Sequence, residues 1–252
     1  MGGRVFTVAQ LSDCHIDGTV RSAERLRRVV SYVRDSADAI DAVVVTGDVA
    51  DEGRPEQYET ALRLLELHLP VLLLPGNHDD REAFRTAIGA TGTEGPVNQR
   101  RQLEDTVLLL LDSTIPGRDE GELTASTLDW LREQLRTVPD GARAVVCLHH
   151  PPVHIGHPGV DALRLTNPDD FRAVLKESSA IAAILAGHVH TAAATEFAGV
   201  PLRIAPAIAS GLKLPGEFRT NPSVFADTDV PPGFALHAFL DHGPVTHFRT
   251  IA

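Results

Sequence analysis

Apolar residues follow two different spacings along the first third of the chain. Short runs rich in β-branched and aliphatic residues indicate three buried strands, at Val5 to Leu11, Ala42 to Thr46 and Val71 to Leu74. Between the first two runs, apolar residues from Leu26 to Ala37 recur at helical spacing behind a candidate N-cap at Ser22. Pro55 opens a second helical segment. This alternation of strands and helices predicts a parallel sheet.

The middle of the chain continues the alternation. Further strands are predicted at Thr106 to Leu111, Ala142 to Leu148 and Ile181 to Leu185. Helices are predicted at Leu123 to Leu135, with Thr124 as candidate N-cap, and near Asp169 to Lys176.

The last quarter of the chain has strand signals and no helix signal. Short strands are predicted at Ala194 to Phe197, Leu202 to Ala205, Phe234 to Leu240 and Val245 to Ile251, and we expect them to form a second, more antiparallel sheet. The stretch from Ile208 to Pro232 has weak periodicity and many Pro, Gly and Asp residues, so we expect a long loop or a subunit-contact segment there.

Length and composition indicate one α/β domain. The 252 residues are 43% hydrophobic, enough for a large core. We predict a single domain over residues 1–252, with a core at about residues 4–205, a loop or contact segment at 206–233 and C-terminal strands at 234–252.

The net charge and the N-terminal sequence argue against some classes of binding partner and against secretion. The formal net charge of -11 argues against general binding of nucleic acids or anionic membranes. No apolar run reaches the ~20 residues that span a bilayer, and the N-terminus lacks a signal-peptide pattern. With only Cys14 and Cys147 as thiols, we expect a cytoplasmic protein without a disulfide.

Polar clusters follow five of the predicted strands directly. They are Asp13-Cys14-His15, Gly47-Asp48, Gly76-Asn77-His78-Asp79, His149-His150 and Gly187-His188-Val189-His190. Each cluster alone is an ordinary loop or turn composition. However, loops at the carboxyl ends of parallel strands converge on one crevice, so the five should meet in space. Carboxylate, imidazole and amide groups together favour a site for divalent metal ions.

Spacing within two clusters suggests which side chains share an ion. In an extended segment, residues i and i+2 point to the same side. Asp13 and His15 can then chelate one ion while Cys14 points away, and His188 and His190 can both reach the cavity.

These clusters resemble the ordered signature of the calcineurin-like metallophosphoesterases, which is D-x-H, GD-x-x-D, GNH-D/E, a His motif and GH-x-H. All five parts match over about residues 10 to 190. The chain looks most like the bacterial cyclic nucleotide and glycerophosphodiester phosphodiesterases. The features that carry this are His149 to Pro152, Leu111 to Gly117, Gly121 to Leu123 and Leu128 to Leu131.

The resemblance implies a four-layer αββα sandwich, in which two mixed sheets are flanked by helices and two divalent metal ions lie at the loop end. It implies that Asp13, His15 and His190 hold one ion, that Asn77, His149 and His188 hold the other, and that Asp48 bridges them. His149 rather than His150 aligns with the ligand, although the sequence leaves the reverse open.

The resemblance also implies catalytic and substrate-binding roles. His78 would face the scissile phosphate, with Asp51 orienting its ring, and Asn77, His78 and His190 would contact the substrate. Whether His78 is a general acid or only a hydrogen-bond donor stays open. The expected reaction is hydrolysis of a small-molecule phosphodiester, including 3',5'-cyclic nucleotides such as cAMP, by a metal-bridging hydroxide. Manganese, iron, zinc and cobalt all suit the donor set.

Two other functions fit the sequence less well. A phosphomonoesterase or protein phosphatase of the same fold is disfavoured because Glu52 stands where the family's protein phosphatases carry a phosphate-gripping Arg. A noncatalytic interaction module is disfavoured because every ligand position is filled.

We also predict a homodimer. The segment from Ile208 to Pro232 carries apolar side chains that are hard to leave in water, at Leu212, Leu214, Phe218, Val224 and Phe225.

Overall fold

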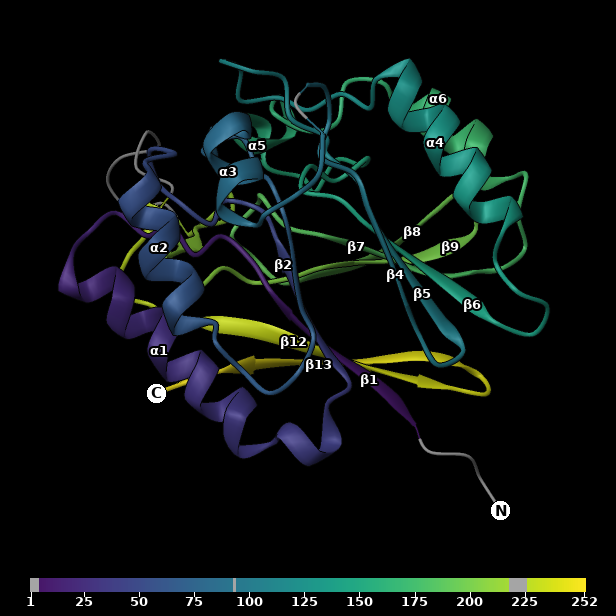
Figure 1. Ribbon diagram of the computed structural model, residues 1–252. Coiled ribbons are helices and arrows are strands. Elements are labelled where there is room, and N and C mark those ends of the chain that lie inside the picture. Colours follow the sequence, from purple (N-terminus) through teal and green to yellow (C-terminus); the bar gives the residue numbers. More distant parts are fainter. Residues whose placement is uncertain (1–4, 93, 218–225) are drawn as a thin grey trace.

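The protein consists of two β-sheets packed face to face, with helices on both outer faces (Figure 1). The computed structural model describes residues 5–92, 94–217 and 226–252. The five-stranded sheet contains, in spatial order, β13 (Gly243–Thr250), β12 (Gly233–Leu240), β1 (Phe6–Leu11), β2 (Ala42–Thr46) and β3 (Val71–Leu74). The six-stranded sheet contains β4 (Gln99–Leu103), β5 (Thr106–Leu110), β6 (Arg143–Cys147), β7 (Ile181–Ala186), β9 (Val200–Ile204) and β8 (Ala193–Phe197).

Helices cover the outer face of each sheet. They are α1 (Val20–Asp35), α2 (Pro55–Leu64), α3 (Arg81–Ala87), α4 (Ala125–Arg136), α5 (Pro158–Asp161) and α6 (Pro168–Leu175), with a 3-10 turn at Ala37–Ala39. A short pair, β10 (Gly211–Leu212) and β11 (Ala226–Asp227), stands apart from the two large sheets. No helix in the described ranges is both long and apolar enough to cross a membrane.

Alternation of side chains along the strands produces the four layers. In β1, Ala9 and Leu11 pack with α1 and α2, whereas Phe6 and Val8 face the second sheet. The six-stranded sheet divides likewise, since Leu108 faces the first sheet and Leu109 packs under α4 and α6. Because successive side chains of a strand point to opposite faces, each sheet is covered by apolar contacts on both sides. The predicted αββα sandwich is confirmed.

The parallel strands place five polar clusters at one edge. β1, β2 and β3 are parallel neighbours, and so are β5, β6 and β7. Their carboxyl ends therefore open toward the same side, as the alternating pattern predicted.

The prediction of a separate antiparallel sheet in the last quarter is wrong. β12 pairs antiparallel with β1, and β13 pairs with β12, so the C-terminal strands extend the first sheet. β9 instead pairs in parallel with β7 and brings β8 into the second sheet. Pairing with β12 covers the backbone edge of β1, and Phe239 packs its ring against Phe6. Because the chain returns to its first strand at its end, we propose that it folds as one domain.

One predicted helix cap differs from the structure, and two short elements were not predicted. The N-cap of α1 is Thr19, whose hydroxyl accepts from the Ser22 backbone N–H at 3.3 Å, while Ser22 lies in the first turn and donates to Asp17. Thr124 caps α4 as predicted. Helix α3 and strand β4 were not predicted, because α3 has only seven residues and β4 is a mostly exposed, polar edge strand.

Candidate metal centre

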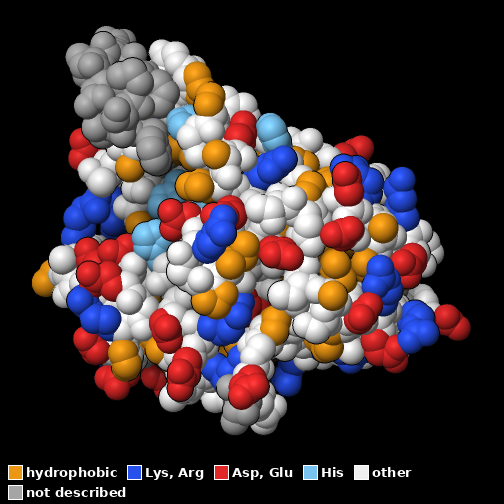
Figure 2. All heavy atoms as spheres, turned by 90° about the horizontal axis from the view of Figure 1, so that it is seen from above, with side chains coloured by type: hydrophobic (Ala, Val, Ile, Leu, Met, Phe, Trp, Pro, Cys, Tyr) orange, Lys and Arg blue, Asp and Glu red, His pale blue; other side chains and the backbone are white. Residues whose placement is uncertain are grey.

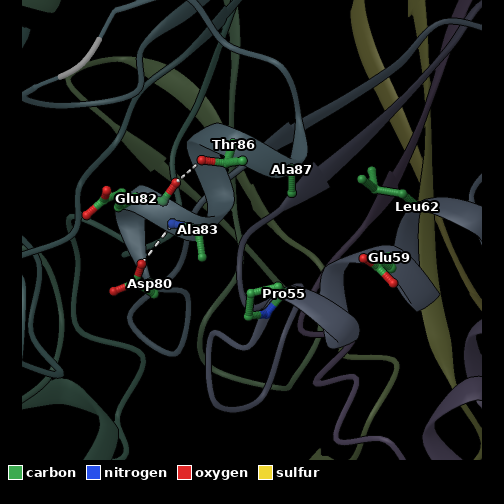
Figure 3. A pocket seen from close by; sticks show the side chains of 8 residues that line it. All are labelled: Pro55, Glu59, Leu62, Asp80, Glu82, Ala83, Thr86 and Ala87. Atoms are coloured by element: carbon green, nitrogen blue, oxygen red, sulfur yellow. Dashed lines mark hydrogen bonds between the residues drawn. The ribbon is translucent and has the colours of Figure 1, made fainter.

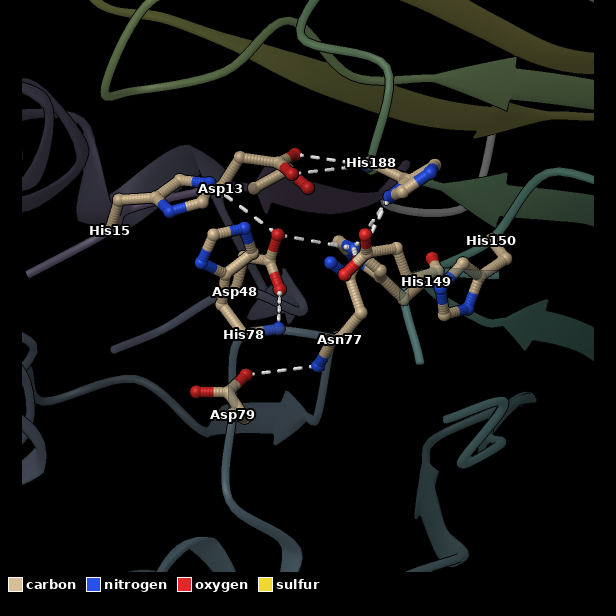
Figure 4. A network of polar contacts seen from close by, with 12 residues as sticks. Asp13, His15, Asp48, Asn77, His78, Asp79, His149, His150 and His188 are labelled. Atoms are coloured by element: carbon tan, nitrogen blue, oxygen red, sulfur yellow. Dashed lines mark hydrogen bonds and ion pairs between the residues drawn. The ribbon is translucent and has the colours of Figure 1, made fainter. Parts of the chain in front are cut away.

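The five polar clusters meet at the carboxyl ends of the strands, as Figure 4 shows for nine of their residues. Histidine side chains gather on this face, among acidic and apolar ones (Figure 2). Asp13, Asp48 and His149 are buried, His15, Asn77, His188 and His190 are partly exposed, and His78 is exposed. The convergence predicted from the strand ends is therefore present.

One group of ligand atoms comes from the loops after β1 and β7. His15 Nε2 lies 3.1 Å from His190 Nε2, and His190 Nε2 lies 3.4 Å from Asp13 Oδ1. Two ligands of one ion, each ~2.1 Å from it, are about 3.0 to 3.4 Å apart in octahedral or tetrahedral geometry. These separations fit one shared cation.

A second group forms a tighter triangle. Asn77 Oδ1 lies 3.1 Å from both His149 Nε2 and His188 Nδ1, and the two histidine nitrogens are 3.2 Å apart. All three distances again fit ligands of a single ion. His188 Nε2, on the other side of that ring, is buried without a hydrogen-bond partner among the described residues.

Asp48 lies between the two groups. Its Oδ2 is 3.4 Å from His15 Nε2 and also 3.4 Å from His149 Nε2. Its Oδ1 accepts a hydrogen bond from the His78 backbone N–H at 2.9 Å, which holds the carboxylate in this orientation. One carboxylate can thus reach two ions.

Hydrogen bonds orient the far side of three histidine rings. His149 Nδ1 donates to Thr46 O at 2.8 Å, and His15 Nδ1 donates to the Asp51 carboxylate at 2.8 Å. Because a carbonyl or carboxylate only accepts, both rings carry hydrogen on Nδ1 and can offer the Nε2 lone pair to a cation. Ser210 Oγ lies 2.8 Å from His190 Nδ1 and can accept from it in the same way.

The geometry distinguishes His149 from His150. Both ring nitrogens of His150 already have partners, since Nδ1 lies 2.8 Å from Ser113 Oγ and Nε2 lies 3.2 Å from Asp119 O. Its ring lies beside that of His188, tilted by 51° with centroids 4.7 Å apart. These contacts favour His149 as the ligand.

Most of the predicted ligand residues have left-handed backbone conformations, not the extended conformation of a strand, and these conformations direct their side chains toward one another. Among the described residues, seven non-glycine positions have positive φ, and five are predicted ligands: Asp13, His15, Asp48, His188 and His190. The expectation of extended segments is therefore wrong, although the side chains still converge and Cys14 points into the core as expected. Such conformations are costly for non-glycine residues and cluster at functional sites.

Glycines precede three predicted ligands at points where neighbouring atoms leave no room for a side chain. A Cβ on Gly47 would lie 2.3 Å from His149 Nδ1, and one on Gly76 would lie 2.2 Å from Asp48 Oδ1. A side chain at either position would displace a ligand, which explains the glycine of each motif.

Charges of the ligand groups shift one another's pKa. Burial opposes protonation of His15, but the hydrogen bond from its ring to Asp51 and the carboxylates of Asp48 and Asp13 raise its pKa to about 9. His149 is likewise raised to a pKa of about 9 against burial, chiefly by Asp48. Burial and the charge of His149 lower the pKa of His188 to about 3. A cation would have to displace protons from His15 and His149, so its binding must be linked to pH.

His78 and Asp51 lie beside the first group. His78 Nδ1 donates to the Asp51 backbone carbonyl at 2.8 Å, whereas the Asp51 carboxylate is 3.7 Å from the same nitrogen. Asp51 therefore contacts the His78 ring through its backbone and the His15 ring through its side chain.

A cavity of about 380 Å³ opens onto the ligands. Its lining includes Asp48, Asn77, His78, His188 and His190. Val160, Leu163 and Leu212 contribute apolar surface, and Asp119 also lines the cavity. No Lys or Arg lines this cavity in the described part of the chain.

Some residues beside the candidate centre lie outside the sequence motifs and were not predicted. Ser210 contacts His190, and Arg21 and Arg25 of α1 line a second cavity that shares His15, His190 and Ser210 with the centre. No motif signal marks these residues, because they come from a helix and an irregular segment. A third cavity between α2 and α3 has Glu59, Asp80 and Glu82 in its lining (Figure 3), and it contains no predicted ligand.

Comparison with known proteins agrees with this geometry. A family model described as calcineurin-like phosphoesterase matches residues 6–192. A probable cyclic nucleotide phosphodiesterase of Rhodococcus erythropolis is 35% identical over 79% of this chain and 69% of its own length. The glycerophosphodiester phosphodiesterase GpdQ of Enterobacter lignolyticus is 36% identical over 71% of this chain and 66% of its own length.

Similarity of fold extends to a crystal structure of a dimetal phosphatase from Danio rerio. It has a TM-score of 0.68 at 16% identity and covers 99% of this chain and 100% of its own. At this identity the similarity concerns the fold alone. The family match and the two sequence relatives go further: the chain belongs to the calcineurin-like phosphoesterase family.

Proposed function

We propose that this protein is a dinuclear metal-dependent phosphodiesterase acting on small molecules, with 3',5'-cyclic nucleotides such as cAMP among its candidate substrates. The observation that carries the proposal is the position of Asp48 Oδ2, 3.4 Å from a ligand nitrogen of each of the two groups. The names of the two sequence relatives support the substrate class.

The residues suit two divalent cations. Asp13, His15 and His190 would hold one, Asn77, His149 and His188 the other, and Asp48 both. When bound, the cations supply Lewis acidity to the phosphoryl oxygens and an activated water. With two dications, Asp13 and Asp48 leave a net positive charge that attracts an anionic substrate to an acidic chain.

His78 would assist departure of the alcohol. Its Nδ1–H is held by the Asp51 carbonyl at 2.8 Å, so protonation at Nε2 gives an imidazolium that can donate to a leaving oxygen. Asn77 and His190 line the same cavity and would contact the phosphate. Asp51 would orient His78 through its backbone and His15 through its carboxylate.

The cavity favours a diester over a monoester. A diester carries one negative charge, whereas a monoester dianion brings a second one into a cavity lined by no Lys or Arg among the described residues. Glu52, at the position of the phosphate-gripping Arg, forms an ion pair with Arg54 and does not line the cavity.

The test compares bis(p-nitrophenyl) phosphate with p-nitrophenyl phosphate, which share a leaving group. With manganese, iron, zinc or cobalt at one pH, we expect kcat/KM to be higher for the diester. A preference for the monoester with every metal would contradict the proposal and indicate a phosphomonoesterase. Retention of no metal and hydrolysis of neither compound would favour an interaction module.

The proposal also covers which metals bind, where the protein acts and how it assembles. The donor set of imidazole, carboxylate and amide suits manganese, iron, zinc or cobalt. Cys14 and Cys147 are buried free thiols, which supports action in the cytoplasm. We also propose that the protein is a homodimer that uses residues 206–233.

A further inference from the structure

A second cavity adjoins the metal centre on the side of α1. It measures about 270 Å³ and shares His15, His190, Asp51 and Ser210 with the centre. Arg21 and Arg25 line it as well. Guanidinium groups therefore lie next to the ligand cluster although they belong to none of the sequence motifs.

Arg25 is a buried cation without a counter-ion. Its side chain is held by carbonyls only, with Nε donating to Ile208 O at 2.6 Å and Nη2 to Val230 O at 2.9 Å, and the residue is 8% exposed. Its Nη1 has no hydrogen-bond partner among the described residues. Burial and the charges of Arg21 and Arg28 lower the pKa of Arg25, and no carboxylate opposes them.

Arg21 adds a second unpaired charge. It donates to Thr228 O, and no ion pair joins it or Arg25 to a carboxylate in the described part of the chain. Residues 1–4, 93 and 218–225 contain no Asp or Glu that could do so. Buried charges in proteins are nearly always paired, so the unpaired Arg25 guanidinium, with the exposed Arg21 guanidinium beside the same cavity, points to an anion from outside the chain.

The two carboxylates of this cavity are already engaged. Asp17 Oδ1 accepts from the Thr19 backbone at 2.8 Å and from the Ser22 hydroxyl at 2.5 Å. Asp51 accepts from His15 at 2.8 Å. Neither forms an ion pair with Arg21 or Arg25 in the described part of the chain, so both guanidiniums remain available to an anionic group.

We propose that Arg21 and Arg25 form an oxyanion subsite beside the metal centre, which takes a carboxylate or phosphate group carried by the substrate at a distance from the scissile phosphodiester. The inference rests on the proposed function. The cavity that opens onto the predicted ligands has Val160, Leu163 and Leu212 in its lining and takes the uncharged ester group, so the preferred substrate is an asymmetric diester with one uncharged and one anionic substituent.

The first experiment uses p-nitrophenyl alkyl phosphates with and without a terminal carboxylate, over a series of chain lengths. We expect the carboxylate to raise kcat/KM by about tenfold at the best length, the effect of one charge-assisted hydrogen bond. Arg21→Gln and Arg25→Gln should remove this preference. Arg28→Gln is the matched control, because Arg28 donates to a carbonyl, Ile251 O at 3.0 Å, and does not line the cavity.

The second experiment does not depend on activity. Sulfate is titrated into metal-free protein while the arginine Nε–H signals are followed by nuclear magnetic resonance. We expect the Arg21 signal to shift, and sulfate to bind about tenfold more weakly in Arg25→Gln and as in wild type in Arg28→Gln. Should Arg25→Gln fail to fold, the exposed Arg21→Gln supplies the same comparison through the Arg25 signal.

The outcomes distinguish failure of the arginine subsite from failure of the proposed function. Arginine-dependent sulfate binding without any preference for carboxylate substrates would assign the subsite to a free anion instead of a substrate group. Absence of both effects overturns the subsite. If bis(p-nitrophenyl) phosphate is not hydrolysed with any metal, the proposed function fails while the sulfate titration still decides the subsite.

Discussion

Three of the predicted ligand histidines are each oriented by a residue outside the predicted ligand set. His149 is held by Thr46 O, His190 by Ser210 and His15 by Asp51. Such contacts set the tautomer and the orientation of the ring, and so they contribute to metal affinity from outside the ligand set. That these histidines converge was predictable from the motifs, whereas the contact of Ser210 was not, because a serine near a loop end has no distinguishing pattern.

Replacing Asp48 and His78 by alanine should give two separable defects. Asp48→Ala removes the carboxylate that lies 3.4 Å from a histidine nitrogen of each predicted ligand group, so we expect loss of most bound metal and of activity. His78→Ala should keep its metal and lower turnover by about 10²- to 10⁴-fold, the range for a lost general acid. Metal analysis together with hydrolysis of bis(p-nitrophenyl) phosphate measures both.

Asp48→Asn serves as a companion, because it keeps an acceptor for the His78 backbone N–H. An empty His78→Ala protein beside a fully loaded Asp48→Ala protein would show that the two roles are assigned to the wrong residues.

Asp51→Asn should weaken metal binding without removing a ligand. The amide keeps a hydrogen-bond acceptor for His15 Nδ1–H at the 2.8 Å position but loses the charge that makes the ring more basic. We expect affinity to fall by about tenfold in a chelator competition assay. Asp80→Asn is the matched control, since Asp80 caps α3 and asparagine caps helices equally well. Equal affinities of Asp51→Asn and wild type would exclude this role of Asp51.

At the scale of elements, regular spacing was predictable and pairing was not. β1, β2 and β3 were found from apolar runs because both faces of these strands are buried, and the helices between them follow from the 3.6-residue period. The partners of β12 and β9 depend on contacts between residues far apart in sequence, such as Phe6 with Phe239, which no local pattern contains. Strand β4 escaped detection because its edge position leaves polar side chains exposed.

Backbone conformation at the strand ends was also out of reach. The sequence pattern located Asp13, His15, His188 and His190, yet it implied extended segments where the structure has positive φ angles from 42° to 73°. Tertiary contacts, including the bond from the His188 N–H to Asp13, hold these turns in place. The convergence of these residues was therefore predictable from the sequence pattern, and their backbone conformation was not.

At the scale of the whole molecule, self-association stays a prediction. Leu212 packs against the second sheet and Leu214 is 39% exposed, while Phe218, Val224 and Phe225 lie outside the described residues. If residues 206–233 form a contact between subunits, light scattering should give a dimer mass at micromolar concentration. Leu214→Asp should shift it toward the monomer, since a charge would enter the contact. A monomer mass for the wild type would contradict the prediction.

A buried polar network joins the two sheets and should make stability depend on pH. His237 of β12 lies 2.9 Å from both Gln10 Oε1 and Thr246 Oγ1, and Gln10 Nε2 donates to Ala186 O of the second sheet at 2.8 Å. Burial and the charge of Arg203 lower the pKa of His237 to about 3. The folded state therefore keeps this histidine neutral, while the unfolded chain protonates it below an ordinary pKa of about 6.5.

Because the unfolded state binds more protons between pH 6.5 and 3, this residue makes the protein less stable as pH falls through that window and has no such effect above it. The slope is about 1.4 kcal/mol per pH unit, so the free energy of unfolding should drop by about 2 kcal/mol between pH 6 and 4.5 through His237 alone. His237→Gln can still donate to Gln10 and cannot be protonated, so it should lose this part of the slope even if it is less stable at pH 7. Urea unfolding at fixed metal concentration measures both proteins, with His247→Gln, on the exposed side of β13, as the control. An unchanged pH slope in His237→Gln would mean that the network accepts a proton without cost.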